Sequence, residues 1–523
     1  EITTRLVGSE MCIRDRGITE NERGFIMSVT TSSPPQKAHT TVQNIGLILA
    51  FIVLGSILLL PTPETLSTGG HRMISVLAFA IILWMTSAVS YPVSATMITA
   101  LTALLLGFSP NPEAPAKAMG TANALKLIIS GYSSPAMILV GAAMFISVAM
   151  RKTGLDRRIA MLVLSSVGTK VSRIYLGVII TGLILAFFVP SATARIACLA
   201  PIIIGIVENL GIERKSRVAA LLMVGAVQAD TFWNIMIQTA AAQNLVAVGF
   251  MQAQMNTSVS WIDWLTAAAP FSIIMAIITY FVTQAFIKPE FKELVGGDVQ
   301  LAKMRKEIGP MTFDEKKLLC ISIGLLALWA TGGKLHSIDT TTTTIIAIAL
   351  FFFPKIGIMD WKFAQPNIDW GSIVMFGAGI GLGSVLLKTK AATWLAQVFV
   401  NAFSLETASV FLLIAIMAAF LILIHLGFAS ATALSSAMIP IVISIVMGHS
   451  AEGLNPLGVT MLMQYAICFG LVLPVNSPQG MVAYGTDTFD VKTFMTTGIP
   501  LTIIGYIMML VFALTYWHWI GIA

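Results

Sequence analysis

Long runs of apolar residues constrain this chain more than any other feature. The runs 42–60 and 271–287 contain no charged residue, and several others are nearly as apolar. A helix of about 20 such residues crosses a hydrocarbon core of about 30 Å. Only 11% of the 523 residues are charged, whereas a soluble domain carries about 25%. The chain is therefore predicted to be an all-α polytopic membrane protein, and we expect it in the inner membrane of a bacterium.

Uninterrupted spans are expected at 42–60, 73–90, 92–107, 264–287, 318–331, 341–353, 371–387 and 497–520, and a further span is expected to end at Met150. Four other apolar stretches are too long for one span or are broken by polar residues: 174–207, 218–250, 407–447 and 457–484. Irregular backbone at membrane depth is tolerated only where protein or a water-filled cavity satisfies its polar groups. We therefore interpret 174–207 and 407–447 as re-entrant hairpins, and the other two stretches as broken helices.

The hairpin sequences reveal an internal repeat. The segment VPSATARIACLAPI at 189–202 shares Ser-Ala-Thr-Ala, a gap of six residues and Pro-Ile with ASATALSSAMIPI at 429–441. Three further blocks recur in the same order, with offsets between 230 and 239 residues. Each repeat contains five spans and one hairpin. An odd number of spans gives the two halves opposite orientations, and such inverted repeats are typical of secondary transporters.

The basic residues predict the orientation of the chain. From Met27 onward, most Lys and Arg fall in loops on one side of the expected spans. By the positive-inside rule that side is cytoplasmic, so we expect a cytoplasmic N-terminus and an external C-terminus. The net charge of +6 comes from these loops, and it does not indicate nucleic-acid binding. The expected external basic residues are Arg72, Lys117, Lys334, Lys388 and Lys390.

The repeat predicts the domain organisation. The expected parts are scaffold helices at 27–132, a first repeat core at 133–287, a charged cytoplasmic linker at 288–317, further scaffold helices at 318–370 and a second repeat core at 371–523. Residues 1–26 resemble translated adapter sequence. We expect them to be non-native, with a natural start at Met27.

The hairpin tips and helix breaks predict the functional site. Helix N-termini at these breaks present unpaired N–H groups and partial positive charge, which favour an anion. Polar side chains near the breaks add hydrogen-bond donors for a small carboxylate: Ser191, Thr193, Asn244, Ser430, Thr432 and Ser477. No metal-binding spacing and no intramembrane nucleophile–base pair occurs in the sequence, so an enzyme is not expected.

The two Ser-Ala-Thr motifs and the segment PVNSPQGMVAYG at 474–485 resemble motifs of the divalent anion/sodium symporter (DASS) family. The resemblance covers residues 42–520. It implies eleven transmembrane helices, two re-entrant hairpins and a homodimer in which a transport domain moves like an elevator against a scaffold. It also implies di- or tricarboxylate substrates such as succinate, malate, citrate or tartrate, with sulfate in some branches.

The sequence departs from the family motifs at residues that the resemblance links to Na⁺ coupling. Both central Asn residues of the hairpin motifs are replaced, by Ala192 and Ala431. Na⁺ could then be held only by backbone and by the hydroxyls of Ser191 and Ser430. The Ala-Arg after the first motif resembles the exchanger branch, so Na⁺ symport and anion exchange both stay open. No cofactor is expected other than Na⁺ or H⁺ as a coupling ion.

Arg195, Asp230 and His425 fall inside the expected spans, where charge is costly. Arg195 is expected to line the cavity as a substrate partner, the alternative being an internal pair with Asp230 or a helix C-terminus. Asp230 would carry a coupled proton or simply pair. His425 would be either a core histidine or a proton site. A cation/proton antiporter is the main alternative to an anion carrier, although Asp230 has no nearby acidic partner in the sequence.

Overall fold

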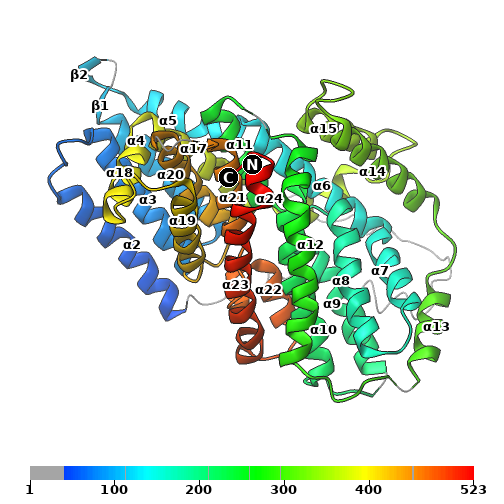
Figure 1. Ribbon diagram of the computed structural model, residues 1–523. Coiled ribbons are helices and arrows are strands. Elements are labelled where there is room, and N and C mark those ends of the chain that lie inside the picture. Colours follow the sequence, from blue (N-terminus) through cyan, green and yellow to red (C-terminus); the bar gives the residue numbers. More distant parts are fainter. Residues whose placement is uncertain (1–39, 112–113, 210, 258, 295, 450–452) are drawn as a thin grey trace, which may run out of the picture. The chain divides into compact units, whose positions relative to one another are not determined.

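Apolar helices form nearly all of the described chain, because a helix satisfies its backbone polar groups within one segment, as a bilayer requires. The computed structural model describes residues 40–523 except 112–113, 210, 258, 295 and 450–452 (Figure 1). The predicted artefact at 1–26 lies outside the described residues. From Val42 onward the chain forms a single unit.

The first half contains α2 (Thr41–Leu59), α3 (Thr68–Thr86), α4 (Tyr91–Gly107), β1 (Pro110–Asn111), β2 (Ala114–Ala118), α5 (Thr121–Ile129), η1 (Ser130–Ser133), α6 (Pro135–Thr153), α7 (Leu155–Ser166), α8 (Val171–Phe188), α9 (Ala192–Asn209), α10 (Arg217–Met236), η2 (Gln238–Ala240), α11 (Ala242–Met255) and α12 (Trp261–Phe286). The second half contains α13 (Gly297–Glu307), α14 (Phe313–Thr331), α15 (Thr340–Phe352), α16 (Trp361–Asn367), α17 (Trp370–Lys388), α18 (Ala391–Ala402), α19 (Val410–His425), α20 (Ala431–Gly448), α21 (Pro456–Ile467), η3 (Pro474–Asn476), α22 (Pro478–Tyr484), α23 (Val491–Leu514) and α24 (Tyr516–Trp519). β1 and β2 pair antiparallel.

The helices confirm the prediction of an all-α polytopic membrane protein. Ten helices of the described chain are long and apolar enough to cross a membrane. Four shorter apolar helices accompany them, namely α4, α15, α19 and α21. Two of the ten, α8 and α9, are consecutive arms of one helical hairpin. Length and composition therefore do not reproduce the predicted count of eleven spans, and re-entry of the hairpins into the membrane stays a prediction.

The order of elements is duplicated. Helices α6 to α12 and helices α17 to α23 each give a long helix, a 12-residue helix, a helical hairpin, a helix interrupted by a 3-10 turn and another long helix. Equivalent helices begin 230 to 239 residues apart: α6 and α17, α9 and α20, α11 and α22, α12 and α23. These are the offsets of the sequence repeat. The two-fold relation between the halves stays a prediction.

The two repeats exchange contacts around their helix breaks. Helix α11, the second part of the first broken helix, packs against α20 of the second hairpin. In the reciprocal contact, α22 packs against α9 of the first hairpin. The long helices α12 and α23 also run side by side (Figure 1). This exchange brings both hairpin tips and both breaks to one region.

Glycines allow the first helix of the second repeat to approach the N-terminal helices. A Cβ on Gly381 of α17 would lie 1.9 Å from the carbonyl oxygen of Ile128, and one on Gly131 of η1 would lie 2.2 Å from the Gly377 oxygen. No side chain fits at such distances. Close backbone contact therefore joins α17 to the segment α5–η1.

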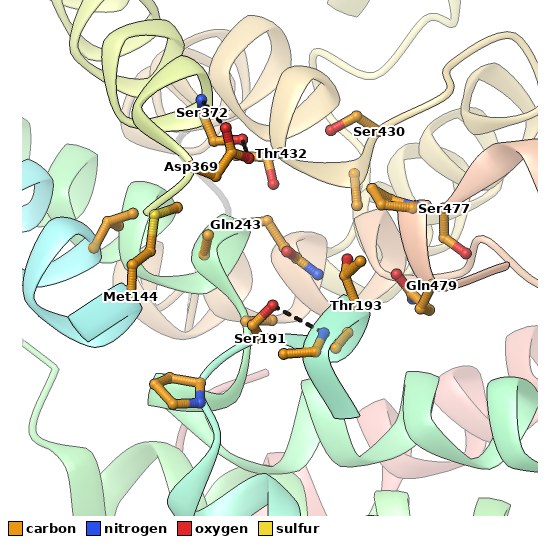
Figure 2. A pocket seen from close by; sticks show the side chains of 18 of the residues that line it. Met144, Ser191, Thr193, Gln243, Asp369, Ser372, Ser430, Thr432, Ser477 and Gln479 are labelled. Carbon is orange, nitrogen blue, oxygen red and sulfur yellow. Dashed lines mark hydrogen bonds between the residues drawn. The ribbon is translucent and has the colours of Figure 1, made fainter. Parts of the chain in front are cut away.

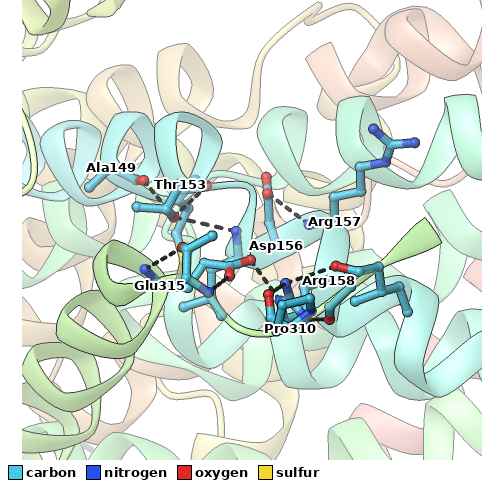
Figure 3. Close-up of polar contacts among 12 residues, drawn as sticks. Ala149, Thr153, Asp156, Arg157, Arg158, Pro310 and Glu315 are labelled. Carbon is cyan, nitrogen blue, oxygen red and sulfur yellow. Dashed lines mark hydrogen bonds and ion pairs between the residues drawn. The ribbon is translucent and has the colours of Figure 1, made fainter. Parts of the chain in front are cut away.

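Arg158 anchors α7 to the end of the charged linker (Figure 3). Its Nε donates to Glu315 Oε1 at 2.7 Å. Its two terminal nitrogens donate to backbone carbonyls of the linker end, all at 3.0 Å: Ile308, Gly309 and Pro310. The corner between α6 and α7 is thereby fixed beside the start of α14.

Candidate functional site

Four helices begin where the hairpins and broken helices interrupt the chain. α8 ends at Phe188 and α9 begins at Ala192, with Pro190 in the tip between them. α20 begins at Ala431 after the second tip. The second parts of the broken helices, α11 and α22, begin at Ala242 and Pro478. All four first residues line one cavity.

Serine hydroxyls cap three of these N-termini. Ser191 Oγ accepts the Ala194 N–H at 3.3 Å, and Ser430 Oγ accepts the Ala433 N–H at 3.4 Å. Ser477 Oγ likewise accepts the Gly480 N–H at 3.2 Å. The N-cap position explains these serines locally, because an N-cap oxygen satisfies a backbone donor that has no partner within the helix. Each hydroxyl also has one hydrogen of its own to donate.

The cavity has a volume of about 600 Å³, within the range typical of small-molecule sites. Figure 2 shows the labelled side chains of both repeats arranged around it. The polar side chains at the tips and breaks are Ser191, Thr193, Gln243, Ser430, Thr432, Ser477 and Gln479. The structure thus brings together five of the six hydroxyl- and amide-bearing residues predicted from the sequence. Their contact with substrate stays a prediction.

The N-termini of α9, α11 and α20 give the cavity its electrostatic character. These helices have 18, 14 and 18 residues, and each N-terminus carries roughly half a positive charge from the aligned peptide dipoles. Unpaired N–H groups at such termini bind carboxylates and phosphates. The arrangement suits an anion that hydroxyl and amide donors approach from both repeats.

Two glutamines were missed by the sequence reasoning. Gln243 and Gln479 stand 236 residues apart at equivalent positions of the repeat, and both line the cavity. Gln243 Nε2 makes only a weak contact, 3.8 Å from Cys468 Sγ. Their amide groups offer N–H donors to an anion. Their shared repeat position was the signal that could have revealed them.

Arg195 does not line the cavity, contrary to the prediction. Its side chain is fully buried, and Nε donates to Asp230 Oδ1 at 2.7 Å. Nη2 donates to the second Asp230 oxygen at 3.1 Å and to Asn234 Oδ1. Nη1 donates to the Val189 carbonyl in the hairpin tip and to the Ala240 carbonyl in the helix break. The alternative of an internal pair with Asp230 is therefore the one observed.

Asn244 also lies behind the cavity wall rather than in it. Its side chain is fully buried, and Nδ2 donates to the carbonyls of Asn234 and Ile237 at 2.6 and 3.3 Å. Its Oδ1 accepts from Gln464 Nε2 at 3.4 Å. Asn244 thus fixes the first helix break and joins it to the broken helix of the second repeat. Its neighbour Gln243 faces the cavity instead.

His425 lies at the edge of the same cavity, at the end of α19. Nε2 is 3.1 Å from the Asn476 carbonyl, which can only accept, so Nε2 carries a hydrogen. Nδ1 is buried without a hydrogen-bond partner among the described residues. Asn476 returns the contact by donating to the carbonyls of His425, Leu426 and Phe428. The second hairpin tip is thereby tied to the second helix break.

Charged side chains of the surrounding helices complete the cavity wall. Arg151 at the end of α6 and Asp369 before α17 both line it. Arg151 Nη2 donates to the Asn367 carbonyl at 3.0 Å, and Asp369 caps α17 by accepting the Ser372 N–H at 3.1 Å. Among the described residues, Arg151 and not Arg195 is thus the arginine that lines the cavity.

Ala192 and Ala431 both line the cavity at the first positions of α9 and α20. Their side chains offer no oxygen. A cation at either tip would therefore depend on backbone carbonyls and on the hydroxyls of Ser191 and Ser430.

Paired helical hairpins and broken helices around one cavity are typical of secondary transporters. The model of the sodium:sulfate symporter transmembrane region matches residues 41–523. The chain therefore belongs to this family, the divalent anion/sodium symporters, and the resemblance noted in the sequence is confirmed.

Relatives extend over most of the chain. A membrane protein of Cupriavidus necator is 47% identical, covering 91% of this chain and 93% of its own length. The L-tartrate/succinate antiporter of Escherichia coli K12 is 27% identical over 90% of this chain and 96% of its own. A sodium-dependent dicarboxylate transporter of Staphylococcus saprophyticus is 24% identical, covering 90% and 91%.

A solved structure supports the fold. The YdaH transporter of Alcanivorax borkumensis superposes with a TM-score of 0.55, covering 84% of this chain and 98% of its own, at 13% identity. At that identity the likeness concerns the fold alone.

Proposed function

We propose that the protein is a secondary transporter of small dicarboxylates, which bind in the cavity between the two hairpin tips. One observation carries this proposal: the N-termini of three long helices and the polar side chains of both repeats converge on one cavity. Donors from opposite sides suit a ligand with a negative group at each end. The relatives named for tartrate, succinate and dicarboxylate transport support the same substrate class.

Inorganic dianions such as sulfate are the competing substrate class, because the matching family model is named for sulfate. A cation/proton antiporter is less well supported. Such an antiporter needs ionisable carboxylates at the transport site. The Asp230 carboxylate is buried against Arg195, and Asp369, which lines the cavity, accepts the Ser372 N–H as the cap of α17. Competition of labelled succinate uptake by tartrate, citrate and sulfate separates the two anion classes.

The coupling mode that we propose is anion exchange with little dependence on Na⁺. In the first repeat, the tip carbonyl of Val189 and the break carbonyl of Ala240 already accept hydrogen bonds from Arg195 Nη1, at 2.7 and 3.0 Å. Hard cations need several such oxygens together. The side chains of Ala192 and Ala431 contain no oxygen that could take the place of these carbonyls. The sequence had suggested that Arg195 is a partner of the substrate. The charge of Arg195 is instead balanced by Asp230, so Arg195 does not neutralise the substrate.

His425 is our candidate for a proton site. It lies beside the second hairpin tip, and a proton on Nδ1 would place a positive charge at the cavity edge. Asp230, the other candidate, has both carboxylate oxygens bonded to Arg195. A coupled proton is therefore better assigned to His425 than to Asp230.

We further propose a cytoplasmic N-terminus, an external C-terminus and a homodimer that moves its transport domain like an elevator. The distribution of basic residues supports the orientation, and family membership supports the dimer and the movement. Light scattering on the purified protein tests the dimer, and labelling of single cysteines with impermeant reagents tests the orientation.

Uptake into proteoliposomes tests the proposed function. Labelled succinate should accumulate faster when unlabelled succinate is inside. Tartrate outside should compete. Uptake equal to that of protein-free liposomes, for succinate, tartrate and citrate alike, would contradict the proposal.

A further inference from the structure

A second pocket, of about 650 Å³, lies outside the cavity at the loop between α15 and α16. Its wall combines lysines with aromatic side chains: Lys152, Phe352, Phe353, Lys355 and Trp361. We propose that this pocket binds the phosphate headgroup of an anionic phospholipid. Neither the family match nor the relatives assign a site here.

The aromatic side chains of the pocket suit the membrane–water interface. The Trp361 ring stacks on Phe145, with centroids 5.8 Å apart, and lies 6.0 Å from Phe352. Trp361 is nevertheless 51% exposed, and Phe353 is 55% exposed. Trp rings are enriched where acyl chains meet headgroups.

Two lysines supply positive charge next to these rings. Lys152 in the last turn of α6 places Nζ 4.9 Å from the centroid of the Phe363 ring. Lys355 is exposed and has φ of +70°, a left-handed conformation that is unfavourable for a residue with a Cβ. The surrounding loop holds it there, since the Gly357 and Ile358 N–H groups donate to the carbonyls of Phe353 and Phe351 at 2.7 and 2.8 Å.

The acidic residue in the pocket wall, Asp360, already accepts a backbone hydrogen bond. Asp360 caps α16, and its Oδ1 accepts the Phe363 N–H at 2.8 Å. A third lysine fixes the loop from outside the pocket: Lys317 Nζ donates to the carbonyls of Ile356 and Gly357 and pairs with Asp314 at 2.8 Å. The pocket therefore presents two lysines to a phosphate and one carboxylate that already accepts a backbone hydrogen bond.

The position of the pocket favours a lipid over a soluble anion. It follows the 13-residue apolar helix α15 and adjoins the start of α14, where the charged linker ends. That side is cytoplasmic in the predicted orientation, and the cytoplasmic leaflet is the one rich in anionic lipids. Exposed Phe353 and Trp361 beside the lysines match the acyl chains of the same molecule.

The pocket also adjoins the wall of the cavity. Arg151, next to Lys152 in the last turn of α6, lines the cavity and donates to Asn367 at the end of α16. A headgroup on Lys152 would hold α6 and α16 together at this point. We therefore expect bound lipid to stabilise the protein.

Thermal unfolding in neutral detergent tests the proposal, with three additives in separate arms: short-chain phosphatidylglycerol, short-chain phosphatidylcholine and inorganic phosphate. Phosphatidylglycerol should raise the midpoint saturably, and the other two should not. Since each basic residue near an anionic surface contributes about a fivefold effect, Lys152→Gln with Lys355→Gln should weaken the apparent affinity about 25-fold. Lys355→Glu alone should weaken it as well.

The matched control is Lys288→Gln with Lys292→Gln, two exposed lysines on the same predicted side but outside the pocket. This variant should respond as the wild type does. An equal response to phosphatidylcholine, a full response to inorganic phosphate alone, or unchanged affinity in both pocket variants would overturn the proposal. Succinate binding, measured on the same samples, reports the cavity separately.

Discussion

Arg195 Nε lies 2.7 Å from Asp230 Oδ1, and both side chains are buried between the first hairpin and the first broken helix. The same guanidinium reaches the hairpin tip at Val189 and the helix break at Ala240. One side chain therefore fixes the relative position of the two irregular segments that form half of the cavity.

We predict that Arg195→Gln destabilises the protein strongly, because it leaves a buried carboxylate unpaired. Losing one partner of such a pair costs about 3–5 kcal/mol. Replacing both partners by apolar residues, as in Arg195→Met with Asp230→Leu, should recover much of the loss. Thermal unfolding of the single and double variants measures the effect.

The control for this prediction is the ion pair between Arg214 and Glu208, whose side chains are 48% and 50% exposed. Arg214→Gln should change stability by less than about 1 kcal/mol. If Arg195→Gln lowered the midpoint no more than Arg214→Gln, the anchoring role of Arg195 would be wrong.

Contacts between hydroxyl groups of the protein and the substrate give a second prediction. Ser430→Ala, Thr432→Ala, Ser191→Ala and Thr193→Ala should each weaken uptake about tenfold to hundredfold, since a hydrogen bond to a charged group contributes about 1.5–3 kcal/mol. Ser430→Gly separates this loss from loss of the N-cap, because Gly at an N-cap costs only a few tenths of a kcal/mol. Apparent affinity for succinate in proteoliposomes is the measurement.

Ser444→Ala is the matched control for the hydroxyl series. Ser444 lies in the same helix as Thr432, and its hydroxyl donates to the Pro440 carbonyl at 3.0 Å, away from the cavity. Affinity unchanged in all four tip variants would remove the hydroxyls from the site.

The sequence could predict the cavity because short local motifs mark the helix N-termini that surround it. The duplicated Ser-Ala-Thr motifs carry the N-caps of α9 and α20, and an N-cap is set by the residue and its next turn. The repeat then implied that the two tips meet. What it could not supply was the direction of each neighbouring side chain.

Asn244 and Arg195 show why that direction was missed. Successive residues on a helix point about 100° apart, so Gln243 faces the cavity while Asn244 faces Gln464. Arg195 follows Ser191 by four residues, about one turn, yet it points to Asp230 on another helix. Such contacts depend on how α9 and α10 pack, and no spacing in the chain records that packing.

Coupling gives a third prediction. Exchange of internal for external succinate should proceed at a similar rate with Na⁺ and with choline, because the carbonyls of Val189 and Ala240 are occupied by Arg195. His425→Gln should reduce any dependence of uptake on external pH. Steep dependence on Na⁺ without stimulation by internal succinate would restore ordinary sodium symport.

A fourth prediction concerns the pH dependence of stability. Desolvation alone would raise the pKa of Glu290, but hydrogen bonds from the backbone N–H groups of Arg217 and Val218 outweigh it and hold the pKa below its ordinary value. A depressed folded-state pKa contributes stability above the unfolded pKa, and this contribution is lost as pH falls through the folded pKa.

Glu290→Gln should therefore lower the thermal midpoint at neutral pH, and the difference from wild type should shrink as pH falls below the ordinary carboxyl range of about 4. Glu208→Gln serves as the control at an exposed carboxylate. A difference that stayed constant across the whole pH range would exclude titration of Glu290 as its cause.

Equilibrium binding of labelled succinate to the purified protein tests the central claim most directly, because it needs neither coupling nor orientation. We predict saturable binding that tartrate displaces. Gln243→Ala and Gln479→Ala, which remove equivalent donors from the two repeats, should each weaken it about tenfold or more, while Ser444→Ala should not. Wild-type affinity in both glutamine variants, in a protein that binds succinate, would contradict a site between the hairpin tips.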